Sequence, residues 1–356
     1  MKFVWMDGDP GHDDAFAILL GLHCPHIKLL GISTTYGNAS GPWTAVNAAR
    51  CLHLFGAAST YPEIRVYPGA AKPLLRPTKH APKIHGVDGL GCVQGLPNAQ
   101  DPNVTRWMAG TAERAINGLS AAVRNTWDNG KGSKVSIISS GPMTNIALFV
   151  SVYPDLLEVI EEIVFMGGGI GIGNKSTVAE YNIACDPLAA QILLDAPVKK
   201  TMIPLNVTHM AILTPQIHAK LLSPAYDWQG ADLPLPTASS NLREMLSALI
   251  SSFAESYRKA FGFADGPPLH DALTVAYIAC PDIFSAKRFR VDVEQSGIHT
   301  SGETVVNLWD YQNCDDGWGV GGNNCLVTQS VDVDAFFGFF DECIQRCDAV
   351  SPLNVY

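Results

Sequence analysis

The chain has 356 residues, of which 47% are hydrophobic and 16% are charged, and its formal net charge is -10. This is the composition of a globular protein with ample material for a large core, and it excludes a disordered chain. The acidic balance and the lack of clustered Lys and Arg argue against nucleic-acid binding, because neutralising phosphates requires clustered positive charge.

Short apolar runs alternate with amphipathic stretches, which predicts βα units. We therefore expect an α/β fold, a mostly parallel central sheet flanked by helices, as a single domain over residues 1–356. In chain order, strands are expected at 2–6, 27–34, 135–140, 160–166, 199–205, 303–308 and 325–330. Helices are expected at 13–22, 43–55, 105–127, 238–260, 270–279 and 332–347. The Pro- and Gly-rich segments 68–104 and 222–238 are predicted to be loops.

The nine cysteines include no C-x-x-C pair, and their number is odd. We therefore expect free, mostly buried thiols in a reducing compartment, which favours a cytoplasmic protein with access to the nucleus. Only six residues precede Asp7, too few for a signal peptide, and no apolar run reaches the length of a membrane span. The sequence thus predicts no membrane partner.

An acidic segment, D-G-D-P-G-H-D-D at residues 7–14, lies between the first predicted strand and the first predicted helix. Ligands bind at this edge of open α/β sheets. Four carboxylates so close together repel one another unless a cation neutralises them. Oxygen ligands of this kind suit Ca²⁺ or Mg²⁺ better than zinc. A helix N-cap would explain Asp13 or Asp14, but it would not explain Asp7 and Asp9.

Two other families use similar sequence patterns. Aspartyl-phosphate phosphatases carry D-x-D after a first strand but require Thr or Val where this chain has Gly11. A dinucleotide site requires G-x-G-x-x-G, and the glycine-rich stretch 167–174 ends in Asn174 instead of the third glycine. Both alternatives are therefore disfavoured.

The acidic segment resembles the N-terminal signature D-x-D-P-G-x-D-D of the inosine–uridine-preferring nucleoside hydrolases. Further motifs of that family follow in the family's order: T-T-Y-G-N (34–38), H-G-V-D-G-L-G (85–91), S-G-P-M-T-N-I-A (140–147), M-G-G-G (166–169), A-E-Y-N-I (179–183) and L-H-D-A (269–272). The resemblance covers most of the chain and extends in particular to the fungal uridine ribohydrolases. It implies the nucleoside hydrolase fold with its Rossmann-like core, and homodimers or homotetramers.

The resemblance implies hydrolysis of the N-glycosidic bond of ribonucleosides (uridine, and inosine and others) to free base and ribose. It implies a Ca²⁺ ion held by Asp9, Asp14, Asp271 and the main-chain carbonyl of Ser140. Asp9 would be the general base for a Ca²⁺-bound water, whose single attack on the ribosyl carbon implies inversion. Asp7 would support Asp9 from outside the ligand set.

The resemblance also implies the substrate contacts. Ribose contacts would come from Asp13, Asn38, Asn174, Glu180 and Asn182, although Gly37 and Gly173 make turn chemistry an alternative for the asparagines. On the base side, His270 beside Asp271 would assist the leaving base, and His85 would be a second histidine. Tyr257 would cap the base pocket or, equally, pack as a core aromatic. Tyr181 stands where relatives often have Phe, and Asp186 is interpreted as a helix N-cap.

Two further hypotheses stay open. The same fold could cleave another riboside, such as a nicotinamide or cytokinin riboside, because the pocket loops decide the substrate. A non-catalytic calcium- or sugar-binding protein is disfavoured, because the candidate base, the leaving-group histidine and every metal ligand are all present.

Overall fold

The computed structural model describes residues 1–230 and 234–354, so residues 231–233 of the predicted 222–238 loop lie outside the described part. Its central sheet has eight strands in the order β3-β2-β1-β4-β5-β6-β10-β7, and β8 and β9 form a separate pair. The neighbours from β3 to β10 pair in parallel, and β7 pairs antiparallel with β10. The strands are β1 (Lys2–Gly8), β2 (Ile27–Thr34), β3 (Val66–Pro68), β4 (Val135–Ser139), β5 (Ile160–Met166), β6 (Lys200–Ile203), β7 (Phe284–Phe289), β8 (Val291–Val293), β9 (Thr304–Val306) and β10 (Cys325–Val331).

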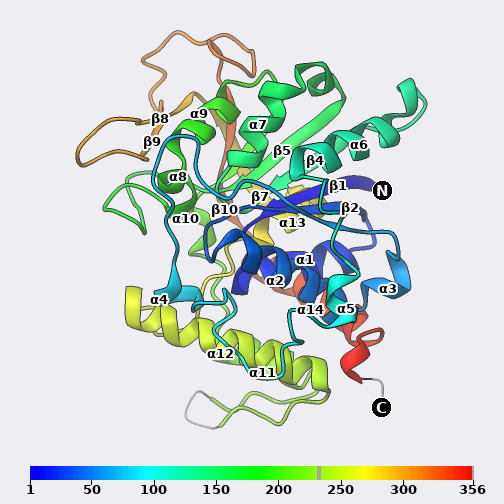
Figure 1. Cartoon of the computed structure of the whole chain (residues 1–356). Helices are drawn as coiled ribbons and strands as arrows, with labels where there is room; N and C mark the ends of the chain where they lie inside the picture. The colour runs from blue at the N-terminus through cyan, green and yellow to red at the C-terminus, as the bar shows by residue number, and fades with distance from the viewer. Residues whose placement is uncertain (231–233, 355–356) are drawn as a thin grey trace.

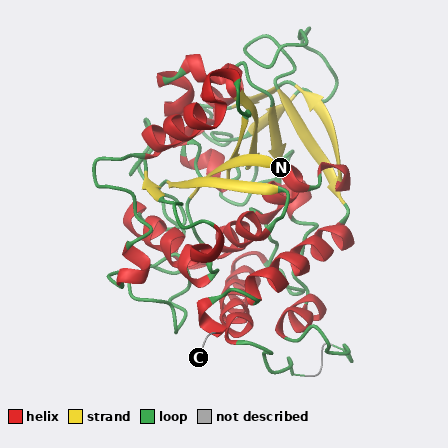
Figure 2. Cartoon of the chain, turned by 90° about the vertical axis from the view of Figure 1, so that its right-hand side faces the viewer, coloured by secondary structure: helices red, strands yellow, loops and turns green. Residues whose placement is uncertain are grey.

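Helices lie on both faces of this sheet (Figures 1 and 2), as predicted for an α/β fold. The helices are α1 (His12–His23), α2 (Gly41–Leu54), α3 (Ala57–Thr60), α4 (Pro82–His85), α5 (Pro102–Thr105), α6 (Ala115–Trp127), α7 (Thr144–Val152), α8 (Tyr181–Cys185), α9 (Pro187–Asp195), α10 (Leu205–Thr208), α11 (Pro215–Leu222), α12 (Asn241–Phe261), α13 (Ala272–Ala279) and α14 (Val333–Asp348). Helices α1, α2, α13 and α14 cover one face, and α6, α7 and α9 cover the other. Among the described residues, every helix is too short or too polar to cross a lipid bilayer.

The strands supply both cores because successive side chains of a strand point to opposite faces. In β1, Val4 and Met6 pack in the core under α1, whereas Trp5 packs in the core on the α7 side. Both faces are buried, which explains why these strands are nearly continuous apolar runs in the sequence. The polar residues that follow the strands are thereby left at the carboxyl edge of the sheet.

The predicted helix at 105–127 is wrong in its first half. Helix α6 begins only at Ala115, and the preceding segment instead runs beside β3, where Met108 forms a bridge with Val66. The strand pairing, which joins distant parts of the chain, overrides the local helical pattern. Helix α7 was not predicted, because its sequence is apolar almost all round and shows no amphipathic periodicity.

Helix α12 is held against α14 by the buried Arg243. Its Nε donates to Asp348 over 2.7 Å, and its Nη1 donates to the carbonyl of Leu221, with the side chain only 2% exposed. We expect Arg243→Leu to lower the free energy of unfolding by roughly 3 kcal/mol, because it removes the Arg243 donor from Asp348 Oδ2 and from the Leu221 carbonyl. Urea unfolding measures this.

The matched control is Arg258→Leu on the same helix, whose side chain is 59% exposed and pairs with Glu255. That variant is expected to change stability by no more than about 0.5 kcal/mol, because exposed pairs contribute little. Equal urea midpoints for the two variants would contradict the role given to Arg243.

Candidate active site

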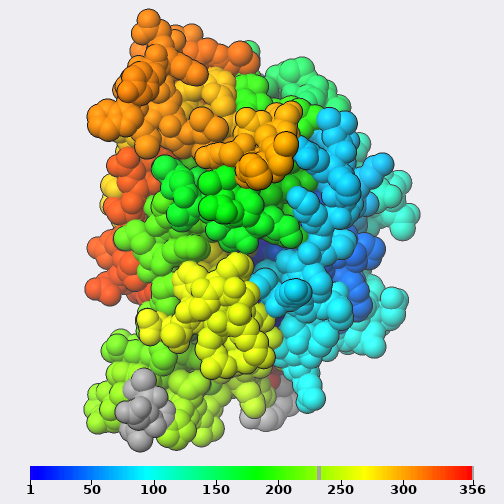
Figure 3. Space-filling view, turned by 90° about the vertical axis from the view of Figure 1, so that its left-hand side faces the viewer, coloured from blue at the N-terminus to red at the C-terminus, as the bar shows by residue number. Residues whose placement is uncertain are grey.

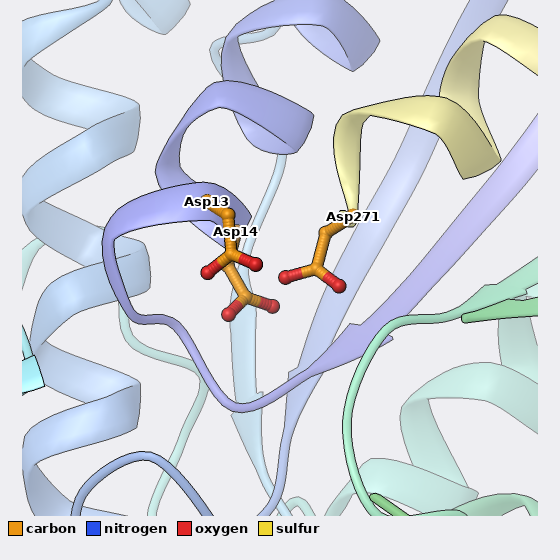
Figure 4. A group of neighbouring side chains, drawn as sticks. All are labelled: Asp13, Asp14 and Asp271. Atoms are coloured by element: carbon orange, nitrogen blue, oxygen red, sulfur yellow. The ribbon is translucent and has the colours of Figure 1, made fainter. Parts of the chain in front are cut away.

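Three carboxylates from distant parts of the chain meet at the carboxyl edge of the sheet. Asp13 and Asp14 stand in the first turn of α1, and Asp271 is the residue before α13 (Figure 4). Each offers an oxygen that lies within 4.8 Å of the others, and all three residues are buried. The acidic segment and the L-H-D-A motif, more than 250 residues apart, therefore form one site.

Asp9 lies beside this group of three. It is fully buried, and its Oδ2 accepts a hydrogen bond from the backbone N–H of Asn38 over 2.7 Å, while its Oδ1 has no partner among the described residues. Two glycines make room for this carboxylate. A Cβ atom on Gly37 would lie 1.9 Å from Asp9 Oδ2, and one on Gly141 would lie 2.6 Å from Asp9 Oδ1.

Side chains and backbone groups of the neighbouring loops make hydrogen bonds to two further predicted metal ligands, Asp14 and the Ser140 carbonyl. Asp14 accepts hydrogen bonds from Ser140 Oγ over 2.8 Å, from Gly11 N over 3.0 Å and from Asn38 Nδ2 over 3.2 Å. The carbonyl oxygen of Ser140 accepts a hydrogen bond from Asn182 Nδ2 over 2.9 Å. The sequence predicted this carbonyl as a metal ligand, and the structure adds the Ser140 hydroxyl as a support for Asp14.

Asp7 has a different environment from the other three aspartates of the segment. Its carboxyl accepts hydrogen bonds from Ser33 and Asn145, and among the described residues it makes no hydrogen bond to Asp9. Its carbonyl accepts from the Ser140 backbone N–H over 2.8 Å. Asp7 therefore ties β1 to the end of β2 and to the segments that follow β4.

The electrostatics of the site favour a cation. Burial, followed by the charge of Asp14, raises the pKa of Asp9 well above its ordinary value, and the same two causes raise the pKa of Asp13 to about 7. Burial also raises the pKa of Asp271, with the charges of Asp13 and Asp14 adding to it. Asp9 Oδ1 and Asp13 Oδ1 are buried without a hydrogen-bond partner in the described part of the chain. An all-oxygen set with unpartnered carboxylate oxygens fits a hard divalent cation.

A cavity of about 470 Å³ opens next to the acidic group. Helix α4 with the two residues before it, the segment around 175 and the end of α12 surround its mouth. They meet at the hollow between the cyan, green and yellow surfaces of Figure 3. Ten predicted site residues line the cavity: Asp13, Asn38, His85, Ser140, Asn174, Glu180, Asn182, Tyr257, His270 and Asp271. Asp9 and Asp14 lie behind this lining.

One wall of the cavity carries acidic and amide groups. Glu180 is the N-cap of α8 and accepts hydrogen bonds from the backbone N–H groups of Asn182, Ile183 and Gly168. Its burial raises its pKa to about 7 in spite of these bonds. Asn174 Oδ1 accepts from the Tyr181 backbone N–H over 2.8 Å. Asn174 thus ties its loop to the start of α8 and also lines the cavity.

The extra hydroxyl of Tyr181 bonds to the protein itself. It donates to the carbonyl of Gly37 over 2.9 Å, and so joins α8 to the loop that presents Asn38. Asp186 caps α9 as predicted, because its Oδ1 accepts from the Ala189 N–H over 3.2 Å.

A second part of the cavity lining consists of histidines and a tyrosine. His270 Nε2 lies 2.6 Å from the Tyr257 hydroxyl, and His270 Nδ1 lies 2.7 Å from Thr208 Oγ1. His85 Nδ1 lies 3.2 Å from His12 Nδ1. Burial lowers the pKa of both His85 and His270 well below the ordinary value, so both rings are neutral at neutral pH. Tyr257 both packs among aromatics and lines the cavity.

Three polar residues at or beside the cavity were not identified from the sequence. Thr208 holds His270, His12 holds His85, and Lys175 lines the cavity. Thr208 follows β6, so the rule that sites form at the carboxyl ends of strands could have found it. No pattern in the sequence identifies His12, which occupies the x position of the family signature.

We expect Gly141→Ala to lower the turnover of any substrate that uses Asp9 by roughly 10²-fold, because the added Cβ displaces the Asp9 carboxylate. Gly338→Ala is the control, since a Cβ there meets nothing within 4 Å. Steady-state kinetics with a folded-state check by circular dichroism measures the difference. Unchanged kinetics in Gly141→Ala would mean that the position of Asp9 does not matter.

Residues 4–338 match the family described as inosine-uridine preferring nucleoside hydrolase. The chain belongs to this family. A "probable ribonucleoside hydrolase" of Dictyostelium discoideum is 35% identical over 97% of this chain and 94% of its own length. The pyrimidine-specific ribonucleoside hydrolase of Shewanella woodyi is 33% identical over 98% of both chains.

Solved structures agree with these sequence relatives. The purine-preferring ribonucleoside hydrolase from Gardnerella vaginalis superposes with a TM-score of 0.81 at 27% identity, over 98% of this chain and 100% of its own. A plant nucleoside hydrolase superposes with a TM-score of 0.79 at 26% identity, over 96% of this chain and 98% of its own. The predicted nucleoside hydrolase family, its α/β fold and its class of reaction, the hydrolysis of N-glycosidic bonds in ribonucleosides, are confirmed.

Proposed function

We propose that this nucleoside hydrolase cleaves uridine, and also inosine and other ribonucleosides, into free base and ribose. The observation that supports this best is the cavity with two unlike walls, one of carboxyl and amide groups and one of histidine and tyrosine. The first wall suits a ribose, whose buried hydroxyls each require a partner. The second wall offers donors to a leaving base.

The purified enzyme should convert uridine to uracil and ribose without any need for phosphate. Chromatography of the products from a panel of nucleosides tests this. The named relatives differ, one being pyrimidine-specific and another purine-preferring, so the panel must contain both kinds of base. A nicotinamide riboside and a cytokinin riboside in the same panel test the alternative substrates. Binding of ribose without turnover of any member would instead favour a non-catalytic protein.

We propose Ca²⁺ as the cation of the acidic group. Asp9, Asp14, Asp271 and the Ser140 carbonyl would hold it, and Asp13, whose oxygen is close to those of Asp14 and Asp271, would face the ribose. Ca²⁺ accepts six to eight oxygen ligands in a flexible arrangement, which leaves room for substrate hydroxyls. When bound, the cation supplies positive charge that keeps these buried carboxylates ionised and makes a neighbouring water more acidic.

Asp9 is proposed as the general base. Its Oδ2 is held by the Asn38 N–H, and its Oδ1 is free of hydrogen bonds to the described residues, so one oxygen is oriented and the other can take a proton from water. That water attacks the anomeric carbon as the bond to the base breaks, and the configuration is inverted. Asn38, Asn174, Glu180 and Asn182 would bind and orient the ribose.

The leaving base would receive a hydrogen bond through Tyr257 and His270. Both ring nitrogens of His270 are engaged, with Tyr257 on one side and Thr208 on the other. If His270 Nε2 carries the ring proton and donates to the Tyr257 oxygen, the tyrosine hydroxyl, which burial keeps protonated by raising its pKa, can donate into the cavity. His270 would return a proton from Nε2 to Tyr257 as Tyr257 gives one to the base, while Thr208 donates to His270 Nδ1.

We expect Tyr257→Phe to lower kcat for uridine by about 10²-fold, because the donor to the leaving base is lost while the ring still packs. Phe261→Leu at the same cavity is the control, since it removes apolar contact without removing a donor. Steady-state kinetics on uridine measures both. A KM change alone in Tyr257→Phe would assign the hydroxyl to binding.

We further propose a cytoplasmic location, which the nine free cysteines support. Assembly into a homodimer or homotetramer stays a prediction, and size-exclusion chromatography with light scattering tests it.

A further inference from the structure

His12 and His85 form a close pair of histidines beside the cavity. His12 is the first residue of α1, His85 is the last residue of α4, and both rings are buried. Their Nδ1 atoms face each other over 3.2 Å, and the backbone N–H of His12 also points at His85 Nδ1 over 3.4 Å. Phe253 from α12 stacks on His12 with ring centroids 5.2 Å apart.

This geometry fixes where the ring protons are. A backbone N–H can only donate, so the nitrogen that it faces, His85 Nδ1, must be an acceptor without a proton. His12 Nδ1 faces the same lone pair and must therefore carry a proton and donate it. His85, being neutral, then has its single proton on Nε2.

The other nitrogen of each ring is consistent with this assignment. His12 Nε2 is buried without a partner among the described residues. With the His12 proton on Nδ1, this Nε2 carries only a lone pair, and an unpaired acceptor is less costly to bury than an unpaired N–H donor. His85 lines the cavity, and with Nδ1 engaged, Nε2 is its only ring atom able to donate a hydrogen bond there. A neutral imidazole in the opposite tautomer would present an acceptor to the leaving base.

We propose that His12 is a positioning residue which sets the tautomer of His85, so that His85 Nε2–H is a hydrogen-bond donor to the leaving base. This inference rests on the proposed function, since it assigns a role within that same site. The proposed hydrogen bond acts on the departure of the base, and it does not change the water activation by Asp9 or the binding of the ribose. Loss of the His12 donor should therefore affect substrates only as far as their leaving group requires a hydrogen bond.

Two substitutions at His12 separate the hydrogen bond from the packing. His12→Phe keeps the aromatic stack on Phe253 but removes the ring donor, which leaves His85 Nδ1 with only the longer bond of 3.4 Å from the backbone N–H. His12→Asn loses the stack but places its amide N–H where Nδ1–H stood. We compare uridine with p-nitrophenyl riboside, whose leaving group is stable as an anion and departs without a donor.

We expect His12→Phe to lower kcat for uridine roughly tenfold or more, with KM little changed, and to leave p-nitrophenyl riboside hydrolysis at the wild-type rate. His12→Asn should recover most of the loss on uridine. Nitrogen NMR of histidine-labelled protein should show a His85 signal of the Nε2–H tautomer in the wild type and in His12→Asn, and an altered signal in His12→Phe.

Equal losses of both substrates in His12→Phe would overturn the proposal, because they would assign His12 to the fold or the acidic site. Wild-type kinetics on uridine in His12→Phe would overturn it as well, and so would a His85 signal of the Nδ1–H tautomer. A wild-type enzyme that cleaves neither substrate would instead contradict the proposed function, so the two failures are distinguishable.

Discussion

Replacing Asp9 by Asn is expected to lower kcat for uridine by roughly 10³- to 10⁴-fold, because the amide cannot take a proton from the attacking water. The fold should be retained. Asn has the size of Asp, and the Asn38 N–H that Asp9 Oδ2 accepts can still donate to an amide oxygen. Asp334→Asn, at an exposed position on α14, is the control for the chemistry of the substitution.

The assay must separate the base from the ligand, since Asp9 is proposed for both. Rates are measured at saturating Ca²⁺, and Ca²⁺ affinity is measured by calorimetry on the same samples. A loss of kcat at saturation assigns the proton transfer to Asp9. A loss that excess Ca²⁺ restores would leave Asp9 as a ligand only, and near-normal hydrolysis of uridine and inosine would contradict the assignment altogether.

The sequence predicted those parts of the fold that local periodicity determines. Strands β1, β2, β4 and β5 lie where their apolar runs predicted them, and Gly56 ends α2 with a positive φ of 70° that glycine tolerates. The segment before α6 was mispredicted as helix because its structure depends on a bridge between Met108 and Val66, which local pattern cannot show. The order of the strands in the sheet was not predicted either, because it is set by pairing between segments that are distant in the sequence.

The candidate site was predictable from motifs, but its internal connections were not. The family signature assigned Asp14 and Asp271 to one site, and their oxygens do lie within 4.8 Å of each other. The hydrogen bonds of His270 to Thr208 and Tyr257 join three segments whose spacing has no regular relation in the sequence. Such contacts are set by how α10, α12 and α13 pack together, which only the three-dimensional structure shows.

The acidic group is also expected to make the enzyme depend on Ca²⁺ for both activity and stability. Treatment with a strong chelator should lower uridine hydrolysis roughly 10³-fold, and added Ca²⁺ should restore it. Without a cation, Asp9, Asp13, Asp14 and Asp271 are buried close together with little to neutralise them. Ca²⁺ at a hundredfold excess over its Kd should stabilise the folded state by about 2.7 kcal/mol.

Thermal unfolding with and without Ca²⁺ measures the stability effect independently of turnover. Asp271→Asn should reduce the Ca²⁺-dependent rise in Tm and the Ca²⁺ affinity together, because it removes one of the clustered carboxylates. Asp334→Asn should leave both unchanged. Recovery of the chelated enzyme by zinc but not by Ca²⁺ would contradict the all-oxygen site, since zinc selects nitrogen and sulfur ligands. Full activity in the chelator, with the cation shown to be absent, would mean that the carboxylates act without a metal.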